Sequence, residues 1–305
     1  MANSILSAAH FHCEEAAFEY VEAALWPNGP VCPHCNETIR IGRLAGKTTR
    51  PGLRKCYTCK KPFTVRMGTI FESSHLALHL WLQVIHLMCA SKKGISTRQI
   101  QRLLKCSMKT AWFLTHRIRL AMTSGSLEPL GGAGKSVEAD ETYLTVSNKT
   151  RRNEDGSRKA KKEVLSLVER DGAIRSMFVD HRNVTGLLRD HVHPETRLLT
   201  DGANRYKNMP VASHESVDHS KFEWTRGDVH TNTLEGFFSV FKRGLVGVYQ
   251  HMDAKHLDRY LVEFDFRYNN RIKLGINDTM RADIALQGVK GKRLTYQTTR
   301  SQEAE

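Results

Sequence analysis

The chain has 305 residues, of which 40% are hydrophobic, and it carries 46 Lys and Arg against 32 Asp and Glu. This length exceeds that of a typical single domain, so we expect a catalytic core accompanied by one or two small modules. The net charge of +14 favours a polyanionic partner, because each neutralised phosphate releases a condensed counterion; a merely soluble basic protein is the alternative.

The sequence lacks the features of a membrane or secreted protein. The longest apolar run, His79–Ala90, is shorter than the roughly 20 residues that span a bilayer, and polar residues interrupt it. Residues 1–25 contain four glutamates and lack the basic start and apolar centre of a signal peptide. Four of the seven cysteines have the spacing of a metal site, which favours a reducing cytosol over a disulfide framework. We therefore expect a cytoplasmic protein without membrane association.

Residues 14–70 are predicted to form a zinc ribbon. Two C-x₂-C pairs, Cys32/Cys35 and Cys56/Cys59, are separated by a stretch that favours short strands and turns. Four thiolates in two such pairs suit the tetrahedral shell of Zn²⁺, and metal binding would supply most of the folding energy of so small a segment. The basic residues around the ribbon, among them Arg54 and Lys55, are either DNA contacts or solvated surface charges.

Residues 74–125 have the periodicity of three helices. Apolar residues from Leu76 to Ala90 follow helical spacing, and Ser96 and Ser107 are placed to cap a second and a third helix. Two short helices separated by a tight turn predict a helix-turn-helix-like module, whose last helix would present Lys109, Thr110, Trp112 and His116 to DNA. A plain three-helix scaffold would show the same periodicity.

A third domain is predicted at residues 135–275, after a glycine-rich linker. Its strands are expected at Ser136–Val146, Glu163–Glu169 and Ala173–Val179, followed by a helix at Asn183–His191 and a strand at Arg197–Thr200. Three antiparallel strands, a helix, a fourth strand and further helices form the order of a ribonuclease H-like α/β domain with a mixed sheet and flanking helices. The basic segment Asn148–Lys162 is either a solvated insertion or a DNA-contacting arm.

Two aspartates in this domain are candidate metal ligands. Alternation along the first strand places Glu138, Asp140 and Thr142 on one face, opposite Val137, Ala139 and Tyr143. A charge in the middle of an apolar strand is costly unless it is paired or bound to a metal, which favours Asp140 as a ligand. Asp201 ends the next apolar strand, and it is either a second ligand or simply a turn residue before Gly202.

The helix expected from residue 232 onward offers the third ligand. Leu234, Phe237, Phe238 and Phe241 form one face, and a second stripe holds Asn232, Glu235, Ser239 and Lys242. Residues three apart are neighbours on a helix surface, so Asn232 and Glu235 can point at one site, while Lys242 is placed to contact a DNA phosphate or terminal base. An amphipathic helix with a solvated polar face is the alternative. Arg243, Arg267 and Arg271 are further candidate DNA contacts, and residues 287–305 are predicted to be a disordered tail.

The motifs CPHC, CYTC, VEADETY, LLTDGANRYK and VHTNTLEGFFSVFKRGLVGVY occur in this order, and the chain resembles bacterial insertion-sequence transposases of the ISXO2-like type. In these proteins an N-terminal zinc ribbon precedes a DDE-type ribonuclease H-like catalytic domain. The resemblance implies a structural Zn²⁺, two catalytic Mg²⁺ or Mn²⁺ ions held by Asp140, Asp201 and Glu235, and a lysine one to two turns beyond the third ligand. Some relatives have Asn at the third position, so Asn232 is the alternative to Glu235.

The resemblance also implies a function. The expected activity is binding of the terminal inverted repeats of an insertion sequence, metal-dependent DNA cleavage and strand transfer, by a homodimer or higher oligomer on the bacterial nucleoid. An inactive DNA-binding protein derived from a transposase, and a ribonuclease H-like nuclease that cuts without joining, are the alternatives.

Overall fold

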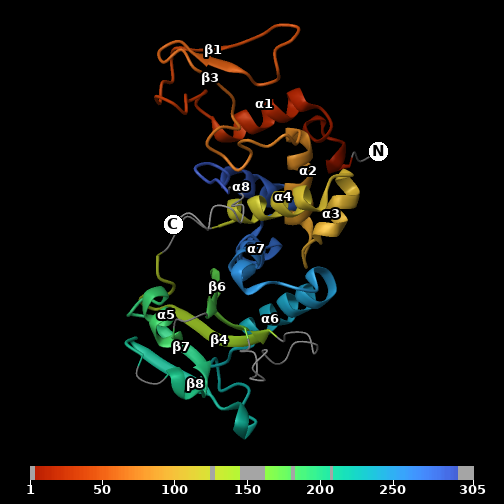
Figure 1. Cartoon of the computed structure of the whole chain (residues 1–305). Coiled ribbons are helices and arrows are strands. Elements are labelled where there is room, and N and C mark those ends of the chain that lie inside the picture. Colours follow the sequence, from red (N-terminus) through yellow and green to blue (C-terminus); the bar gives the residue numbers. More distant parts are fainter. Residues whose placement is uncertain (1–3, 124–127, 145–161, 180–182, 207–208, 295–305) are drawn as a thin grey trace, which may run out of the picture. The chain divides into compact units, whose positions relative to one another are not determined.

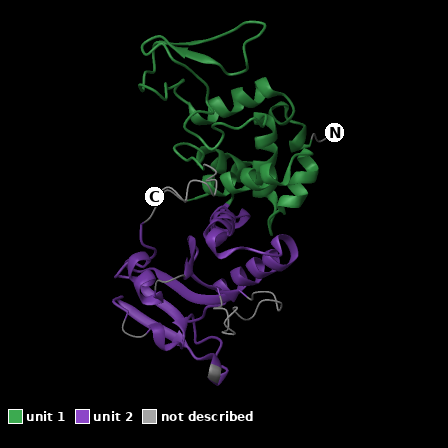
Figure 2. Cartoon of the chain, viewed as in Figure 1, with its two compact units in different colours: residues 1–123, 275–305 green, residues 124–274 purple. Residues whose placement is uncertain are grey.

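The computed structural model describes residues 4–123, 128–144, 162–179, 183–206 and 209–294 (Figure 1). The basic segment predicted at 148–162 lies outside these residues, apart from Lys162. The chain divides into two compact units, with residues 1–123 and 275–305 in unit 1 and residues 124–274 in unit 2 (Figure 2). Within the described ranges, every helix is too short or too polar to cross a bilayer.

Unit 1 combines a small antiparallel sheet with a group of helices. Its elements are α1 (Glu14–Leu25), β1 (Ile41–Arg43), β2 (Arg54–Cys56), β3 (Pro62–Phe63), α2 (Leu78–Ala90), α3 (Thr97–Leu104), α4 (Met108–Ala121) and α8 (Asp278–Gln287). Short 3₁₀ turns precede α1 at Ile5–Ser7 and Ala9–Phe11. The three strands pair in the order β1-β2-β3.

The predicted caps of α3 and α4 are present. The Ser96 hydroxyl accepts the Gln99 amide at 3.2 Å, and the Ser107 hydroxyl accepts the Thr110 amide at 3.0 Å. Each cap satisfies an amide that has no partner inside the helix. Lys105 ends α3 in the left-handed conformation, with φ of 49°, and this turns the chain sharply into α4.

The C-terminal segment corrects one predicted boundary. The expected tail begins at 287, but Gln287 ends α8, and Val289 two residues later is fully buried. Lys290 pairs with Thr69, and the carbonyl of Leu294 accepts the Arg117 Nε at 3.2 Å. The polar composition of residues 288–294 conceals this, because one buried valine and a few backbone contacts are sufficient to hold the strand-like segment. Residues 295–305 of the predicted tail lie outside the described residues.

Unit 2 is built on a five-stranded mixed sheet in the order β6-β5-β4-β7-β8. Its elements are β4 (Ser136–Leu144), β5 (Lys162–Glu169), β6 (Ile174–Val179), α5 (Val184–His191), β7 (Arg197–Asp201), β8 (Ser213–Val217), α6 (Asn232–Gly244) and α7 (Leu257–Asn269). One-turn helices lie at Asn204–Tyr206, His219–Lys221, Ala254–His256 and Ile272–Leu274, and a π-helical turn at Leu245–Tyr249 extends α6. β4, β5 and β6 are antiparallel, whereas β7 and β8 run parallel to β4. The predicted ribonuclease H-like fold class is confirmed.

The two faces of this sheet have separate cores. Val137 and Ala139 of β4 pack in a cluster with α5, whereas Leu144 belongs to the cluster that β5 forms with α6 and α7. Successive strand residues point to opposite faces, so the even-numbered residues of β4 face α6 and α7. Asp140 therefore lies on the face of the sheet that α6 covers.

Helix α7 closes the outer edge of the sheet. β6 is an edge strand whose outward amides would otherwise lack partners, and side chains of α7 accept them in place of a sixth strand. The pairs are Ile174 N with Asn269 Oδ1 at 2.7 Å, Ser176 N with Asp265 Oδ2 at 2.6 Å, and Phe178 N with Asp258 Oδ1 at 3.2 Å. The helix runs antiparallel to the strand, which fixes both the rotation and the register of α7 on the sheet.

Candidate functional site

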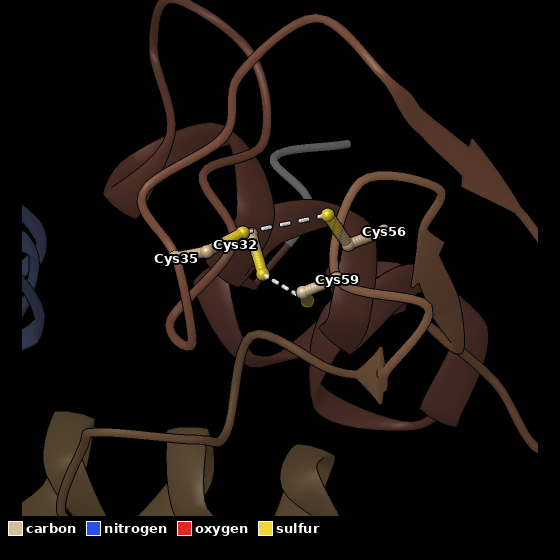
Figure 3. A group of neighbouring side chains, drawn as sticks. All are labelled: Cys32, Cys35, Cys56 and Cys59. Atoms are coloured by element: carbon tan, nitrogen blue, oxygen red, sulfur yellow. Dashed lines mark hydrogen bonds between the residues drawn. The ribbon is translucent and has the colours of Figure 1, made fainter.

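The four cysteines of unit 1 converge as a metal-binding cluster. Their sulfurs all lie within 4.8 Å of one another, with Cys32 Sγ 3.7 Å from Cys59 Sγ and Cys35 Sγ 3.6 Å from Cys56 Sγ (Figure 3). A tetrahedron with Zn–S bonds of about 2.3 Å has edges of about 3.8 Å, so this spacing suits Zn²⁺. The cluster supports a structural zinc ion.

The local sequence explains why the two cysteine pairs have the same shape. Each C-x₂-C pair is followed by a residue in the left-handed conformation, Asn36 at φ 59° and Lys60 at φ 60°. This turns the chain back after the second sulfur of each pair. Cys32 and Cys56 are fully buried and pack with Phe63, and Trp26, the residue after α1, packs against the same group.

The third helix of the predicted DNA-binding module presents only part of its predicted face. Lys109 and Thr110, in the first turn of α4, are exposed, and Trp112 is half-buried. His116 is fully buried, so its predicted exposure to a DNA groove is wrong. Helical periodicity alone could not distinguish the two sides of α4, because α2 and α8 also pack in this unit and cover more of the helix than a three-helix arrangement would.

In unit 2, the strand register brings Asp140 and Asp201 side by side. β4 and β7 are parallel neighbours, with Glu138 opposite Leu199. Continuing that register by two residues places Asp140 opposite Asp201, the last residue of β7. Residues in register on parallel strands point to the same face, so both carboxylates lie on the face covered by α6. The Asp201 carboxylate also accepts the Ala203 amide at 3.1 Å, so it has the predicted turn role as well.

Helix α6 presents the candidate third ligand and the predicted lysine. Leu234, Phe237, Phe238 and Phe241 are buried in the core against the sheet, as the spacing predicts. Asn232, Glu235, Lys242 and Arg243 are all exposed, and the charge of Glu235 acts on Asp140. Lys242 follows Glu235 by two helical turns, or about 10 Å along the axis.

The surroundings of Asp140 favour its protonated form. Burial, and to a lesser extent the negative charges of Asp201, Glu141 and Glu235, together raise the pKa of Asp140 to about 7, against the lowering effect of the Glu141 amide. That amide donates to Asp140 Oδ1 at 2.7 Å. An acid whose pKa lies this high in a cluster of like charges is a site where a cation would be strongly stabilised.

Other carboxylates of the same sheet differ from these three because they form ion pairs with arginines. Arg205 Nη1 lies 3.2 Å from Glu141 Oε1 and also contacts Glu163, while Arg170 Nε lies 3.2 Å from Glu138 Oε1. Among the described residues, Asp140, Asp201 and Glu235 form no ion pair with Lys, Arg or His. Within the described ranges, the three predicted ligands therefore differ from the adjacent acids, which each pair with an arginine.

The three carboxylates are nevertheless not drawn together as tightly as the cysteines. Of the described Cys, His, Asp and Glu residues, the four cysteines alone form a group of three or more with all ligating atoms within 4.8 Å. Like charges repel one another, and a multivalent cation would offset the repulsion among these carboxylates.

Comparison with known proteins finds a family match for each of two regions of the chain. Residues 129–269 match the ISXO2-like transposase domain, and residues 12–62 match the transposase zinc-ribbon domain. The chain belongs to the ISXO2-like transposases. It is also 26% identical over 277 residues to an uncharacterized protein in transposable element ISH50 of Halobacterium salinarum, covering 84% of this chain and 91% of that relative.

The structure separates the predicted DNA contacts of this transposase into two groups. Lys109, Lys242 and Arg243 are exposed and Lys55 is half-buried. Arg54, Arg267 and Arg271 are instead engaged within their own units: Arg54 Nη2 donates to Glu22 at 2.5 Å, Arg267 is 8% exposed and paired with Glu263, and Arg271 Nη1 donates to the Tyr268 carbonyl at 2.9 Å. The three arginines are therefore engaged in packing contacts within their own units, and their contact with DNA stays a prediction. The sequence does not reveal these contacts, because a basic side chain has the same appearance whether it binds DNA or a group of its own domain.

Several residues around the site were not predicted. Glu138 is fully buried although it is charged, and it contacts both Arg170 and the first turn of α6. Arg205 neutralises Glu141 on the opposite face of β4 from Asp140. Burial, together with the charge of Glu141, raises the pKa of the Tyr206 hydroxyl well above its ordinary value. The sequence did contain a sign of this role. A charge within an apolar strand needs a partner or a metal, and that argument holds for Glu138 as well as for Asp140.

Proposed function

We propose that this chain binds the terminal inverted repeats of an insertion sequence and catalyses divalent-metal-dependent cleavage and strand transfer of DNA. The observation that carries the proposal is the ion-pair pattern of the sheet. Among the described residues, Glu138 and Glu141 each pair with an arginine, whereas Asp140 and Asp201 form no ion pair. Burying a carboxylate without a partner is unfavourable, so these two positions are suited to a cation that comes from outside the chain.

The donor set matches a hard divalent cation. Asp140, Asp201 and Glu235 offer carboxylate oxygens and Asn232 a neutral carbonyl oxygen, which are the ligands that Mg²⁺ and Mn²⁺ prefer. A pair of such ions supplies activation of water or of a 3′ hydroxyl and stabilisation of the leaving 3′ oxygen. The protein residues hold the carboxylates in place on β4, β7 and α6, and no covalent bond between protein and DNA is needed.

The exposed cations are proposed to position the DNA. Lys242 and Arg243 at the end of α6 would hold phosphates of the strand being cut. Lys109 on α4 and the zinc ribbon would contact the terminal repeat away from the cleavage site. Because two DNA ends must be joined to one target, we propose that the active form is at least a dimer.

The test is cleavage of a synthetic duplex that carries the terminal repeat of the element and its flank, with Mg²⁺ or Mn²⁺. Asp140→Asn and Asp201→Asn are each expected to lower the cleavage rate by more than about 100-fold. Substituting a residue that only supports a metal ligand already lowers metal affinity or activity by about 10- to 100-fold. Glu215→Gln is the matched control. It also removes a carboxylate from the sheet, but that carboxylate is paired with Arg197 near solvent. Wild-type cleavage by Asp140→Asn or Asp201→Asn would refute the proposed site.

The same assay decides the remaining alternatives. Glu235→Gln and Asn232→Ala separate the two candidates for the third ligand: if Glu235→Gln cleaves normally and Asn232→Ala does not, the ligand is Asn232. Cleavage without strand-transfer products would make the chain a nuclease. Binding of the repeat without metal-dependent cleavage would make it a DNA-binding protein.

A further inference from the structure

Glu138 occupies the N-terminus of α6 as a cap supplied from another part of the chain. Its Oε2 accepts the amides of Thr233 at 3.1 Å and Leu234 at 3.3 Å, and its Oε1 accepts the Thr233 hydroxyl at 2.8 Å. The residue at the usual capping position, Thr231, makes no side-chain cap. A carboxylate bonded to first-turn amides also interacts favourably with the helix dipole.

Arg170 holds the other side of this carboxylate. Its Nε donates to Glu138 Oε1 at 3.2 Å, and its Nη2 donates to the carbonyl of His230 at 3.3 Å. His230 immediately precedes the cap residue Thr231. Glu138 and Arg170 together therefore tie both the last residues of the loop and the first turn of α6 to strands β4 and β5.

This anchor joins the two parts of the candidate site. Glu138 is two residues from Asp140 on the same face of β4, a spacing of about 7 Å along the strand. At its other end it bonds Thr233, which lies between Asn232 and Glu235 in the first turns of α6. A single side chain thus links the strand that carries Asp140 to the helical turn that carries both candidate third ligands.

The apolar face of α6 does not provide the same constraint. Leu234, Phe237 and Phe241 hold the helix against the sheet, but hydrophobic contact is not directional. A shift of one residue would move the helix by about 1.5 Å and rotate its side chains by about 100°. Directional hydrogen bonds from the first turn of α6 to the fully buried carboxylate of Glu138 oppose such a shift. Burying that charge is costly, which weakens the case for a role in stability alone.

We propose that Glu138 is a positioning residue, which sets the rotation and register of α6 so that its ligand-bearing turn faces Asp140. The inference rests on the proposed metal site. It goes beyond it because Glu138 itself is not a ligand: both of its oxygens are used by α6 and Arg170.

The test compares metal binding and cleavage in Glu138→Gln and Thr233→Val, both with zinc bound. Glu138→Gln keeps the shape but replaces one acceptor oxygen with an amide donor that faces other donors. Thr233→Val keeps the volume and the amide and removes one hydrogen bond. Glu215→Gln again serves as the control, and thermal unfolding and zinc content show whether each variant is folded.

Direct Mn²⁺ titration followed by electron paramagnetic resonance supplies a readout that does not depend on activity. The relevant signal is the part of the Mn²⁺ binding that the wild-type chain shows and the Asp140→Asn variant lacks. Glu138→Gln is expected to weaken this binding, and to raise the Mg²⁺ concentration for half-maximal cleavage, by 10- to 100-fold, as for other residues that orient metal ligands. Thr233→Val should shift both in the same direction by a few-fold. The KM for DNA should stay unchanged, which a general loss of folding would not produce.

The outcomes are distinct. If folded Glu138→Gln binds Mn²⁺ as wild type does, the inference is overturned; if Glu138→Gln does not fold, wild-type binding by Thr233→Val overturns it. If the wild-type chain shows no Mn²⁺ binding that depends on Asp140, the inference and the metal site both fail. If the wild-type chain binds Mn²⁺ but does not cleave, the proposed function alone fails, and the Mn²⁺ affinities of the variants still decide the role of Glu138.

Discussion

The carboxylate of Asp265 at the edge of the sheet leads to a prediction about stability that is independent of DNA chemistry. Asp265 accepts the Ser176 amide at 2.6 Å and the Ser176 hydroxyl at 2.7 Å. Burial nevertheless raises its pKa from 3.8 to about 7, because the two hydrogen bonds from Ser176 and the charge of Arg175 compensate only in part. The ionised form is therefore less favourable in the fold than in the unfolded chain.

The size and sign follow from the linkage between protonation and folding. A rise of about three pKa units corresponds to about 4 kcal/mol lost from the free energy of unfolding once Asp265 is ionised in both states. The loss grows as the pH rises from about 4 to about 7, by about 1.4 kcal/mol per pH unit, and is then constant. Of this total loss of stability, about 2 kcal/mol occurs between pH 5.5 and pH 8.5.

Asp265→Asn removes this dependence and leaves other titrating groups in place. We expect the stability of the variant relative to wild type to rise by about 2 kcal/mol between pH 5.5 and 8.5. The hydrogen bond that the amide cannot accept lowers stability by about 1–3 kcal/mol at every pH, so it changes the offset and leaves the slope unaltered. Urea unfolding followed by amide hydrogen exchange in peptides from residues 162–179 and 257–269 reports on unit 2 alone.

Asp258→Asn is the matched control. Asp258 caps the same edge strand through the Phe178 amide at 3.2 Å, but the residue is exposed to water. Its substitution removes the same kind of acceptor from the same edge strand without removing a buried charge, so it reports the effect of the lost hydrogen bond. A flat difference for Asp265→Asn, or one that falls as the pH rises, would refute the reasoning from burial.

Two further predictions concern unit 1. Cys56→Ser replaces a fully buried sulfur ligand of the cluster. Bound zinc measured by mass spectrometry should then fall well below one ion per chain, and hydrogen exchange should accelerate at residues 30–63. A full zinc complement in this variant would contradict the four-cysteine site. Deleting residues 278–305 removes the buried Leu286 and Val289 and should lower the free energy of unfolding by at least about 3 kcal/mol. Deleting residues 295–305 should change it by less than about 0.5 kcal/mol. Equal melting temperatures for the two truncations would show that α8 is dispensable.

Where the sequence predicted well, a short pattern had one physical meaning. The C-x₂-C pairs predicted the cluster, and Ser96 and Ser107 predicted the helix starts, because each depends only on neighbouring residues. The first four strands of unit 2 and α5 were also predicted within a few residues, and α6 begins at the expected residue. β8 was missed, since its sequence SHESV lacks the apolar run that marked the other strands.

Two contacts were not predicted, and they have different origins. Arg267 was predicted to contact DNA, but Glu263, four residues earlier on α7, and the ring of Phe264 hold it within unit 2. Val289 was predicted to lie in a disordered tail, but it is buried in unit 1, whose other residues lie almost entirely before residue 124. A single valine gives no local sign of such a contact, because its partners are distant in the sequence.

The same consideration distinguishes the carboxylates of β4. Glu138, Asp140 and Glu141 are equally acidic in the sequence, and alternation separates only Glu141 from the other two. The difference between Glu138 and Asp140 arises from what the fold places opposite them. Glu138 meets Arg170 and the amides of α6, whereas Asp140 meets the charges of Asp201 and Glu235. One acid is thereby committed to holding the helix, and the other is left for a cation, so the two roles proposed here depend on each other and neither follows from a single residue.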